Sequence, residues 1–549
     1  MPLRPKFSIV AAPIEKPLPL WILYPLFFVL VYLAHWPLLR LPYFWDEAGY
    51  YIPAALDYFR TGALIPHSTL TNAHPPLPSI LLAAWWHISG LAINGTRTFL
   101  CMVAAFAFLG VFRLTRVLVD SPTAAIVTFL TAIYPVWFAQ STLAHADLFA
   151  AAFALWGLSF YLQRYTSDEP PRTRTLLLAA TLFSLAALSK ETAIVTPIAL
   201  ALWEITLLLT ERIQKTAHAA WALALATPIL PLALWYLYHY RRTGFAFGNP
   251  EFLRYNASAN ISAARILLSL WHRIVHLTVH MNLYVPIVAT LAVLLIPRLP
   301  IPTRFRPQPA LTAIILVIAA NALAFSVLGG ALLTRYLLPL YPLVILLCVL
   351  LWRSRGTRIL AGLTALTTVA FLAGLWINPP YSIAPEDNLT YRDFVLLHQQ
   401  AIALIARQFP YATVLTAWPA TTELAHPDLG YTRVPIKTVA LDNFSLDQIQ
   451  RAAADPGAYD TALIFSTKWN PPGLNLSRRT QASDTAYYDY HHDLSPSDVA
   501  RLLRGDIVWY RSRHGEWAAV LRFPRSNEAK LTQPPHPHLR CIHPRPHPR

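Results

Sequence analysis

The first long apolar segment of the chain is followed by the stretch Tyr43-Phe44-Trp45-Asp46-Glu47-Ala48-Gly49-Tyr50-Tyr51, which contains two adjacent carboxylates. A carboxylate at the end of a membrane span is energetically costly unless it is solvated, paired with a cation or part of a functional site. The side of the membrane on which Asp46 and Glu47 lie therefore bears on both the fold and the function.

The composition is typical of a polytopic membrane protein. Of the 549 residues 55% are hydrophobic and 13% are charged, whereas soluble domains carry about 25% charged residues. The net charge of +16 is spread over short loops between apolar segments. This distribution favours topology signals over a nucleic-acid partner. Three cysteines, far apart in the sequence, do not suggest a disulfide framework or a thiolate metal site.

The positive-inside rule orients the apolar segments. Basic residues place the N-terminus, 1–19, in the cytoplasm, so the first span, at about 18–39, delivers Asp46 to the outer side. Residues 47–61 are predicted as a short amphipathic helix on the membrane surface, and 77–93 as an apolar helix that does not cross, since crossing would turn the basic loops outward. The predicted fold is a polytopic α-helical membrane protein with about eleven transmembrane helices, the others at 97–117, 121–140, 147–163, 175–189, 192–210, 217–238, 283–297, 310–330, 336–352 and 357–377.

The transmembrane domain is predicted over 20–377, with outer loops at 40–96 and 239–282. After it the composition becomes that of a soluble protein, which predicts a small extracytoplasmic α/β domain at 378–532. Its elements are strands at 413–417 and 461–465, helices at 393–407 and 446–454, and a hairpin of 507–510 with 517–523. The Pro- and His-rich tail 533–549 is predicted to be disordered.

Asp46 and Glu47 are the first candidate catalytic residues. A general base on the acceptor side is what sugar transfer with inversion requires, and a phosphate leaving group needs no protein acid. The alternative is structural: Asp46 caps the following helix and Glu47 complements its dipole.

Four further polar sites are predicted on the same face. Asp147, a third catalytic candidate, lies at the start of a span and could also simply cap it. Lys190 is a candidate for the donor phosphate, although an ion pair with Glu191 is the plainer reading. His74 and the pair Arg335-Tyr336 are the other phosphate-binding candidates, with a surface turn and a snorkelling arginine as their alternatives.

Neither a glycine-rich phosphate loop nor a tight His/Cys cluster is evident in the sequence. A membrane enzyme with outward acids and cations but no nucleotide site suits a lipid-linked phosphate donor. No cofactor is predicted with certainty. A divalent metal held by Asp46 and Asp147 is left open.

At these residues the chain resembles the GT-C glycosyltransferases, in the class of protein O-mannosyltransferases and aminoarabinose lipid A transferases. The similarity runs over about 20–377 and rests on the order of five short motifs: Trp45-Asp46-Glu47-Ala48, His74-Pro75-Pro76-Leu77, Ala146-Asp147, Leu188-Ser189-Lys190-Glu191 and Arg335-Tyr336-Leu337-Leu338-Pro339.

The resemblance implies a sugar donor on polyprenyl phosphate, an extracytoplasmic active site and inversion at the anomeric carbon. It implies Asp46 as the catalytic acid of the first outer loop and Asp147 as the second acidic site. His74 falls where the lipid A transferases often have lysine, and Glu191 replaces the glycine that follows their lysine, so a Lys190–Glu191 pair would compete with phosphate.

The predicted function is transfer of a sugar from polyprenyl phosphate to a lipid, glycan or protein acceptor at the bacterial inner membrane, with Asp46 as base. One alternative is a lipid or sugar transporter or flippase, which would place acids and bases at mid-span. Another is a non-catalytic envelope-assembly protein.

Overall fold

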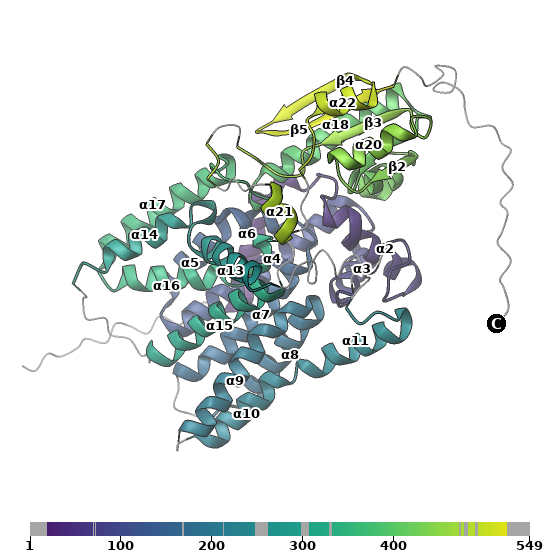
Figure 1. Ribbon diagram of the computed structural model, residues 1–549. Coiled ribbons are helices and arrows are strands. Elements are labelled where there is room, and N and C mark those ends of the chain that lie inside the picture. Colours follow the sequence, from purple (N-terminus) through teal and green to yellow (C-terminus); the bar gives the residue numbers. More distant parts are fainter. Residues whose placement is uncertain are drawn as a thin grey trace, which may run out of the picture.

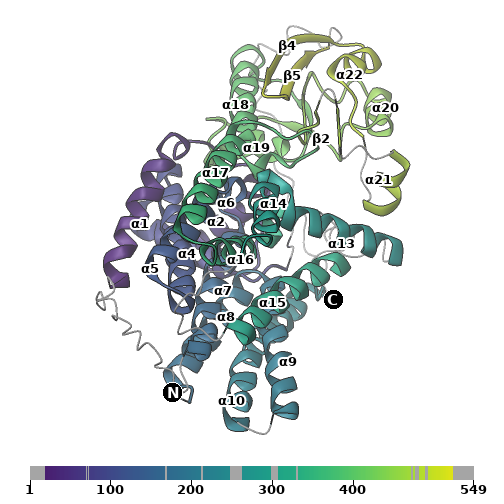
Figure 2. The same ribbon diagram turned by 90° about the vertical axis from the view of Figure 1, so that its left-hand side faces the viewer.

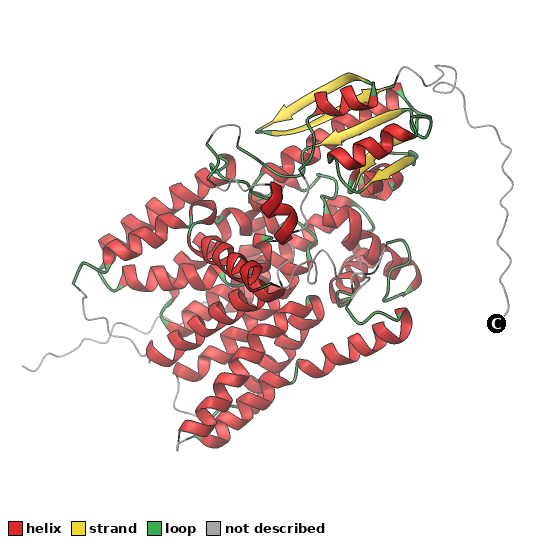
Figure 3. Cartoon of the chain, viewed as in Figure 1, coloured by secondary structure: helices red, strands yellow, loops and turns green. Residues whose placement is uncertain are grey.

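The computed structural model describes residues 19–523 except 70, 72, 167–169, 212–213, 248–261, 298–306, 329–331, 472–473, 477–480 and 489–491. The predicted disordered tail at 533–549 and the cytoplasmic N-terminus up to residue 18 lie outside the described residues. A body of helices carries a mixed sheet with its own helices at one end (Figures 1 and 3).

The helical body contains sixteen labelled helices in the described part of the chain. They are α1 (Leu20–Ala34), α2 (Ile52–Thr61), α3 (Leu77–Ser89), α4 (Ile93–Leu118), α5 (Ser121–Ile133), α6 (Pro135–Gln140), α7 (Ala146–Leu162), α8 (Thr173–Ser189), α9 (Val195–Thr210), α10 (Lys215–Ala226), α11 (Ile229–Thr243), α13 (Ala263–Thr278), α14 (Tyr284–Val293), α15 (Pro307–Leu328), α16 (Tyr341–Arg353) and α17 (Thr357–Trp376). Short helical turns that matter for the site are η2 (Glu47–Tyr51), η4 (Glu191–Ile194), η7 (Thr334–Leu337) and η8 (Pro385–Asp387).

The count of eleven spans is not confirmed. Among the described residues, six helices are long and apolar enough to cross a membrane, or seven if the bent pair of α13 with its following turn and α14 is one span. Several predicted spans are too short: α1 has 15 residues, about 22 Å at 1.5 Å per residue, against a hydrocarbon core of about 30 Å. The predicted span 121–140 is broken at Tyr134, which is extended because Pro135 follows it.

The predicted outer loop 239–282 is largely helical where it is described. Helix α13 exposes Leu267, Trp271 and Ile274 and buries Arg265 and Arg273, the reverse of a helix on a soluble protein. It then bends by 95° into α14. Figure 2 shows α13 extending sideways out of the helical body, above α15.

The C-terminal sheet has strands β1 (Val414–Ala417), β2 (Thr438–Leu441), β3 (Thr461–Phe465), β4 (Asp506–Arg513) and β5 (Glu516–Arg522), in the order β2-β1-β3-β5-β4. β1 pairs in parallel with β2 and β3, and β5 is antiparallel to β3 and β4. The predicted strands and hairpin are confirmed. The helices around the sheet are α18 (Thr390–Gln408), α19 (Ala420–Ala425), α20 (Leu446–Ala454), α21 (Gln481–Tyr488) and α22 (Pro496–Leu503).

Glu516 is a buried carboxyl in this sheet, and it should make stability depend on pH. Burial raises its pKa to about 7, with Asp393 adding to the rise and a hydrogen bond from the Ser466 hydroxyl opposing it. Because the folded pKa lies above the ordinary value, the folded state holds a proton that the unfolded state loses. The contribution of Glu516 to stability is therefore fully present below the ordinary carboxyl pKa of 4.5, and it is lost as the pH rises to about 7, by at most about 1.4 kcal/mol per pH unit.

Thermal unfolding of the full chain in detergent between pH 5 and pH 8 checks this expectation. The wild type should lose stability up to about pH 7 and level off above it, and Glu516→Gln should lose less, because its amide does not ionise. Asp506→Asn, at an exposed position of β4, should keep the wild-type slope. Equal slopes for wild type and Glu516→Gln would contradict the assignment.

Candidate functional site

Arg335 is the centre of a buried ionic cluster. Its Nη1 lies 2.7 Å from both carboxylate oxygens of Glu386, and its Nη2 donates to Oδ2 of Asp46. Its Nε lies 3.4 Å from Oδ2 of Asp147. The four side chains come from η7, η8, the start of η2 and the first turn of α7, so one guanidinium fork joins four separate elements.

Lys190 completes the cluster from the end of α8. Its Nζ donates to Oδ1 of Asp147 at 2.6 Å and lies 3.9 Å from the centre of the Tyr336 ring. The structure thus brings together five of the seven predicted site residues: Asp46, Asp147, Lys190, Arg335 and Tyr336.

His74 lies beside this cluster, with a different partner. Its Nδ1 is 2.8 Å from Oε2 of Glu191, and its ring stacks on that of Tyr51 at 6.2 Å. The predicted Lys190–Glu191 pair is wrong, because Lys190 binds Asp147 and Glu191 binds His74. Neighbouring residues at a helix start point in different directions, which separates the two charges.

Glu47 is not brought into the cluster. It is fully buried, and its carboxylate accepts from Arg97 at 2.6 and 2.9 Å and from the backbone N–H groups of Phe44 at 2.8 Å and Ala144 at 2.5 Å. Three of these four charge-assisted bonds tie the Asp46 loop to α4 and to the segment before α7, and the fourth lies within the loop. This arrangement fits a structural role, and the catalytic role predicted for Glu47 gains no support from it.

The capping alternatives are not realised by the side chains. Asp46 stands at the N-cap position of η2 without a side-chain capping bond. Asp147 lies inside the first turn of α7, whose N-cap is His145, and its carboxylate goes to Lys190 and Arg335. Both carboxylates therefore pair with cations and do not cap a helix.

Sequence reasoning missed Glu386 and Arg273. Burial raises the pKa of the Glu386 carboxyl to about 8, against the opposing effect of Arg335. Arg273 of α13 has its Cζ 5.9 Å from the centre of the Tyr336 ring. Glu386-Asp387 follows the last apolar segment as Asp46-Glu47 follows the first, and this second pair of acids was the available signal.

A narrow cavity of about 20 Å³ reaches the cluster between helices α7, α9 and α15. Its polar end is formed by Asp147, Lys190, Arg335 and Tyr336. Its walls are mostly small or apolar, formed by Ala150, Ala151, Ala154, Thr192, Ala193, Thr196, Asn321, Phe325 and Pro339. Two cations, Lys190 and Arg335, therefore border a small cavity with mostly apolar walls.

Asp46 differs from the other carboxylates in its access to solvent. Its side chain is 27% exposed, against 3% for Asp147 and 4% for Glu386. A second substrate arriving from outside the cluster would therefore meet Asp46 first.

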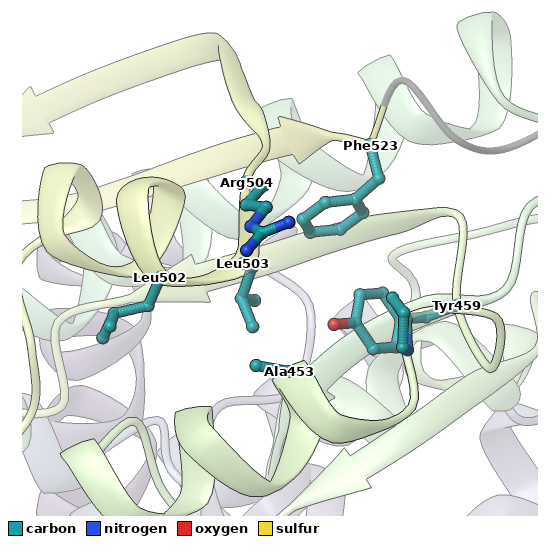
Figure 4. Close-up of a pocket in the computed structure, with 7 residues that line it drawn as sticks. Ala453, Tyr459, Leu502, Leu503, Arg504 and Phe523 are labelled. Atoms are coloured by element: carbon teal, nitrogen blue, oxygen red, sulfur yellow. The ribbon is translucent and has the colours of Figure 1, made fainter.

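A second cavity lies away from the cluster. This cavity of about 230 Å³ lies in the sheet region beside α20 and α22 (Figure 4), lined by Ala453, Pro456, Tyr459, Leu502, Leu503, Arg504 and Phe523. It contains none of the predicted site residues. In the part of the chain that the structure describes, no group of three or more His, Cys, Asp or Glu side chains is arranged to hold a metal ion.

Comparison with known proteins gives a family match and a fold match. Residues 73–236 match the family model of the dolichyl-phosphate-mannose-protein mannosyltransferases. The structure is similar to that of ArnT from Cupriavidus metallidurans bound to undecaprenyl phosphate, with a TM-score of 0.53, 14% identity, and coverage of 90% of this chain and 98% of that chain. For ArnT in the apo state the values are 0.54, 14%, 90% and 97%.

No curated protein matches the sequence. At 14% identity the likeness to ArnT shows the fold. Together with the family match, it confirms the predicted resemblance to the GT-C membrane glycosyltransferases.

Proposed function

We propose that this chain is an integral-membrane glycosyltransferase that moves a sugar from a polyprenyl phosphate to a hydroxyl group of a lipid, glycan or protein on the extracytoplasmic side. The observation that carries the proposal is the ionic cluster of Asp46, Asp147, Lys190 and Arg335, of which the last three border the cavity. The family match and the fold of ArnT, solved with undecaprenyl phosphate, support the same donor class.

In this proposal the donor phosphate binds at the polar end of the cavity. Lys190 has three N–H donors and gives one of them to Asp147. Arg335 and Tyr336 border the same space. The carboxylate partners hold both cations in place before the substrate arrives, so little reorganisation is needed when the phosphate gains charge.

Asp46 acts as the general base on the acceptor side. Its carboxylate takes the proton of the acceptor hydroxyl, the hydroxyl oxygen attacks the anomeric carbon, and the bond from that carbon to the phosphate oxygen breaks. The polyprenyl phosphate leaves with the bonding electrons, stabilised by Lys190 and Arg335. Attack from the face opposite the phosphate inverts the anomeric carbon.

The transporter alternative requires a functional acid or base within a span, and Glu204 of α9 is a buried carboxylate away from the cluster. This group is held by His218 at 2.8 Å, by the hydroxyl of Tyr161 at 2.5 Å and by Arg164. These contacts join α7, α9 and α10, so Glu204 serves the packing of these helices. The charged groups of the Arg335 cluster border a cavity instead, which favours an enzyme over a transporter.

The proposal is tested by supplying radiolabelled sugars to membranes that contain the full chain. Undecaprenyl-phosphate-linked hexoses and pentoses are compared with the same sugars on nucleotide diphosphates, and membranes without the chain are the control. Label should move to a lipid, glycan or protein fraction from the lipid-linked donors. Transfer from the nucleotide sugars alone, or movement of donor across the membrane without transfer, would refute it.

A further inference from the structure

Trp45, the residue before Asp46, is held in an uncommon backbone conformation. Its φ is +44°, in the left-handed region that a bulky residue rarely adopts and that costs of the order of 1–3 kcal/mol. Such a conformation persists when surrounding contacts determine it. Here the contacts are aromatic: the Trp45 ring lies 5.5 Å from Phe394 and 5.2 Å from Trp418, both edge-to-face.

Both partners belong to the C-terminal sheet region. Phe394 is in the first turns of α18, and Trp418 directly follows β1. The aromatic pairs therefore link the loop that carries Asp46 to residues that lie more than 340 positions later in the chain.

Trp418 also touches the other side of the Asp46 segment. A Cβ added to Gly49 would lie 2.2 Å from Nε1 of Trp418, so the indole rests directly on the glycine backbone. One indole thus contacts the residue before Asp46 and the third residue after it. Glycine permits this approach because it has no side chain.

The loop is tied to the same region at a third place. The N–H of Tyr43 donates to the carbonyl of Leu429 at 3.3 Å, and the hydroxyl of Tyr431 donates to the carbonyl of Tyr43 at 3.0 Å. The sheet region therefore fixes the loop at Tyr43, Trp45 and Gly49, which surround Asp46.

We propose that Trp418 is a positioning residue for Asp46 and that the C-terminal sheet region is for this reason part of the transfer site. The proposal rests on the proposed function, in which the Asp46 carboxylate receives the acceptor proton. A base displaced by about 1 Å can cost roughly a hundredfold in rate. The indole has this influence because it fixes the backbone on both sides of the carboxylate.

The first test is independent of activity. Hydrogen–deuterium exchange of peptides covering Tyr43–Tyr51 is followed in the full chain, for wild type and Trp418→Ala. Exchange should rise in the variant within this segment. Tyr510→Ala is the matched control, since Tyr510 is an aromatic residue of the same sheet and is 51% exposed. Unchanged exchange in Trp418→Ala would overturn the proposal, whether or not sugar transfer is observed.

The second test is kinetic, in membranes in which wild-type transfer has been measured. Trp418→Ala should lower kcat by about 10–100-fold, with the KM for the polyprenyl-phosphate sugar within about twofold, because the donor contacts are elsewhere. Trp418→Phe should recover most of the rate, since a ring remains to cover Gly49. It also serves as the test variant if Trp418→Ala folds poorly.

A double variant separates positioning from general destabilisation. If Trp418 acts through Trp45, the losses of Trp45→Ala and Trp418→Ala should not multiply in the double variant, because both break one contact. Multiplying losses, a rise in donor KM without a fall in kcat, or wild-type kcat in both single variants would overturn the proposal. Increased exchange in Trp418→Ala, together with a wild type that transfers no sugar, would instead refute the glycosyltransferase assignment and leave the structural contact standing.

Discussion

Replacing Asp46 with asparagine should lower kcat by roughly 10²–10⁴-fold, the range that a positioned general base contributes. The amide has nearly the same size as the carboxylate, and its oxygen can still accept the bond from Nη2 of Arg335. It cannot take the acceptor proton. Since Lys190 and Arg335 remain in place, binding of polyprenyl phosphate should stay within about twofold of the wild type. Initial rates at saturating donor, together with competition by labelled undecaprenyl phosphate, measure the two quantities separately.

Asp428→Asn is the matched control for this variant. Asp428 is 53% exposed and pairs with Arg60 at 2.8 Å on the surface, and an exposed pair of this kind contributes little. Its kcat should equal that of the wild type. If Asp46→Asn kept its kcat, Asp46 would not be the base. If it lost donor binding in proportion to rate, Asp46 would belong to the donor site.

The proximity of the site residues could be predicted because the membrane topology assigns them to the same layer. Asp46, Asp147, Lys190 and Arg335 each stand at the end of an apolar segment, and the positive-inside rule placed all four on one face. Residues confined to one layer of a compact helical body have few possible positions, so they lie close to one another. This is why short motifs, each weak alone, identified residues that are in contact.

The pairings within the site could not be predicted in the same way. Glu47 follows Asp46 in the sequence, yet its carboxylate turns to Arg97 while that of Asp46 turns to Arg335. The direction of each side chain depends on the local backbone, and Trp45, whose φ is positive, packs against Trp418, far away in the sequence. The sequence of residues 43–51 alone does not predict that contact.

The count of eleven spans is not confirmed, because several apolar segments form helices shorter than the segments themselves. α16 begins at Tyr341, five residues later than predicted, because the Arg335 turn and Pro339 precede it. This difference matters for the site, since it leaves Arg335 and Tyr336 on the separate turn η7 rather than within the long helix.

Arg335→Lys should reduce kcat by about 10²–10³-fold although the charge is kept. The guanidinium donates to Glu386 and Asp46 in two directions and turns its Nε toward Asp147. A lysine ammonium is a single point at the end of a flexible chain and cannot hold three carboxylates at these separations. The expected result is a misplaced Asp46 and a weaker field at the donor phosphate, measured as a fall in kcat at saturating donor.

Arg353→Lys is the matched control, because Arg353 is also an arginine at a helix end, 26% exposed and paired with Asp120 away from the cluster. Its kcat should match the wild type. A normal kcat in Arg335→Lys would show that positive charge alone suffices at this position. If Arg335→Lys accumulates poorly, adding Glu386→Gln should restore folding, because the amide does not need the two hydrogen bonds that the guanidinium gives to the Glu386 carboxyl group. That double variant should still transfer slowly, because Glu386→Gln does not return the guanidinium fork that holds Asp46.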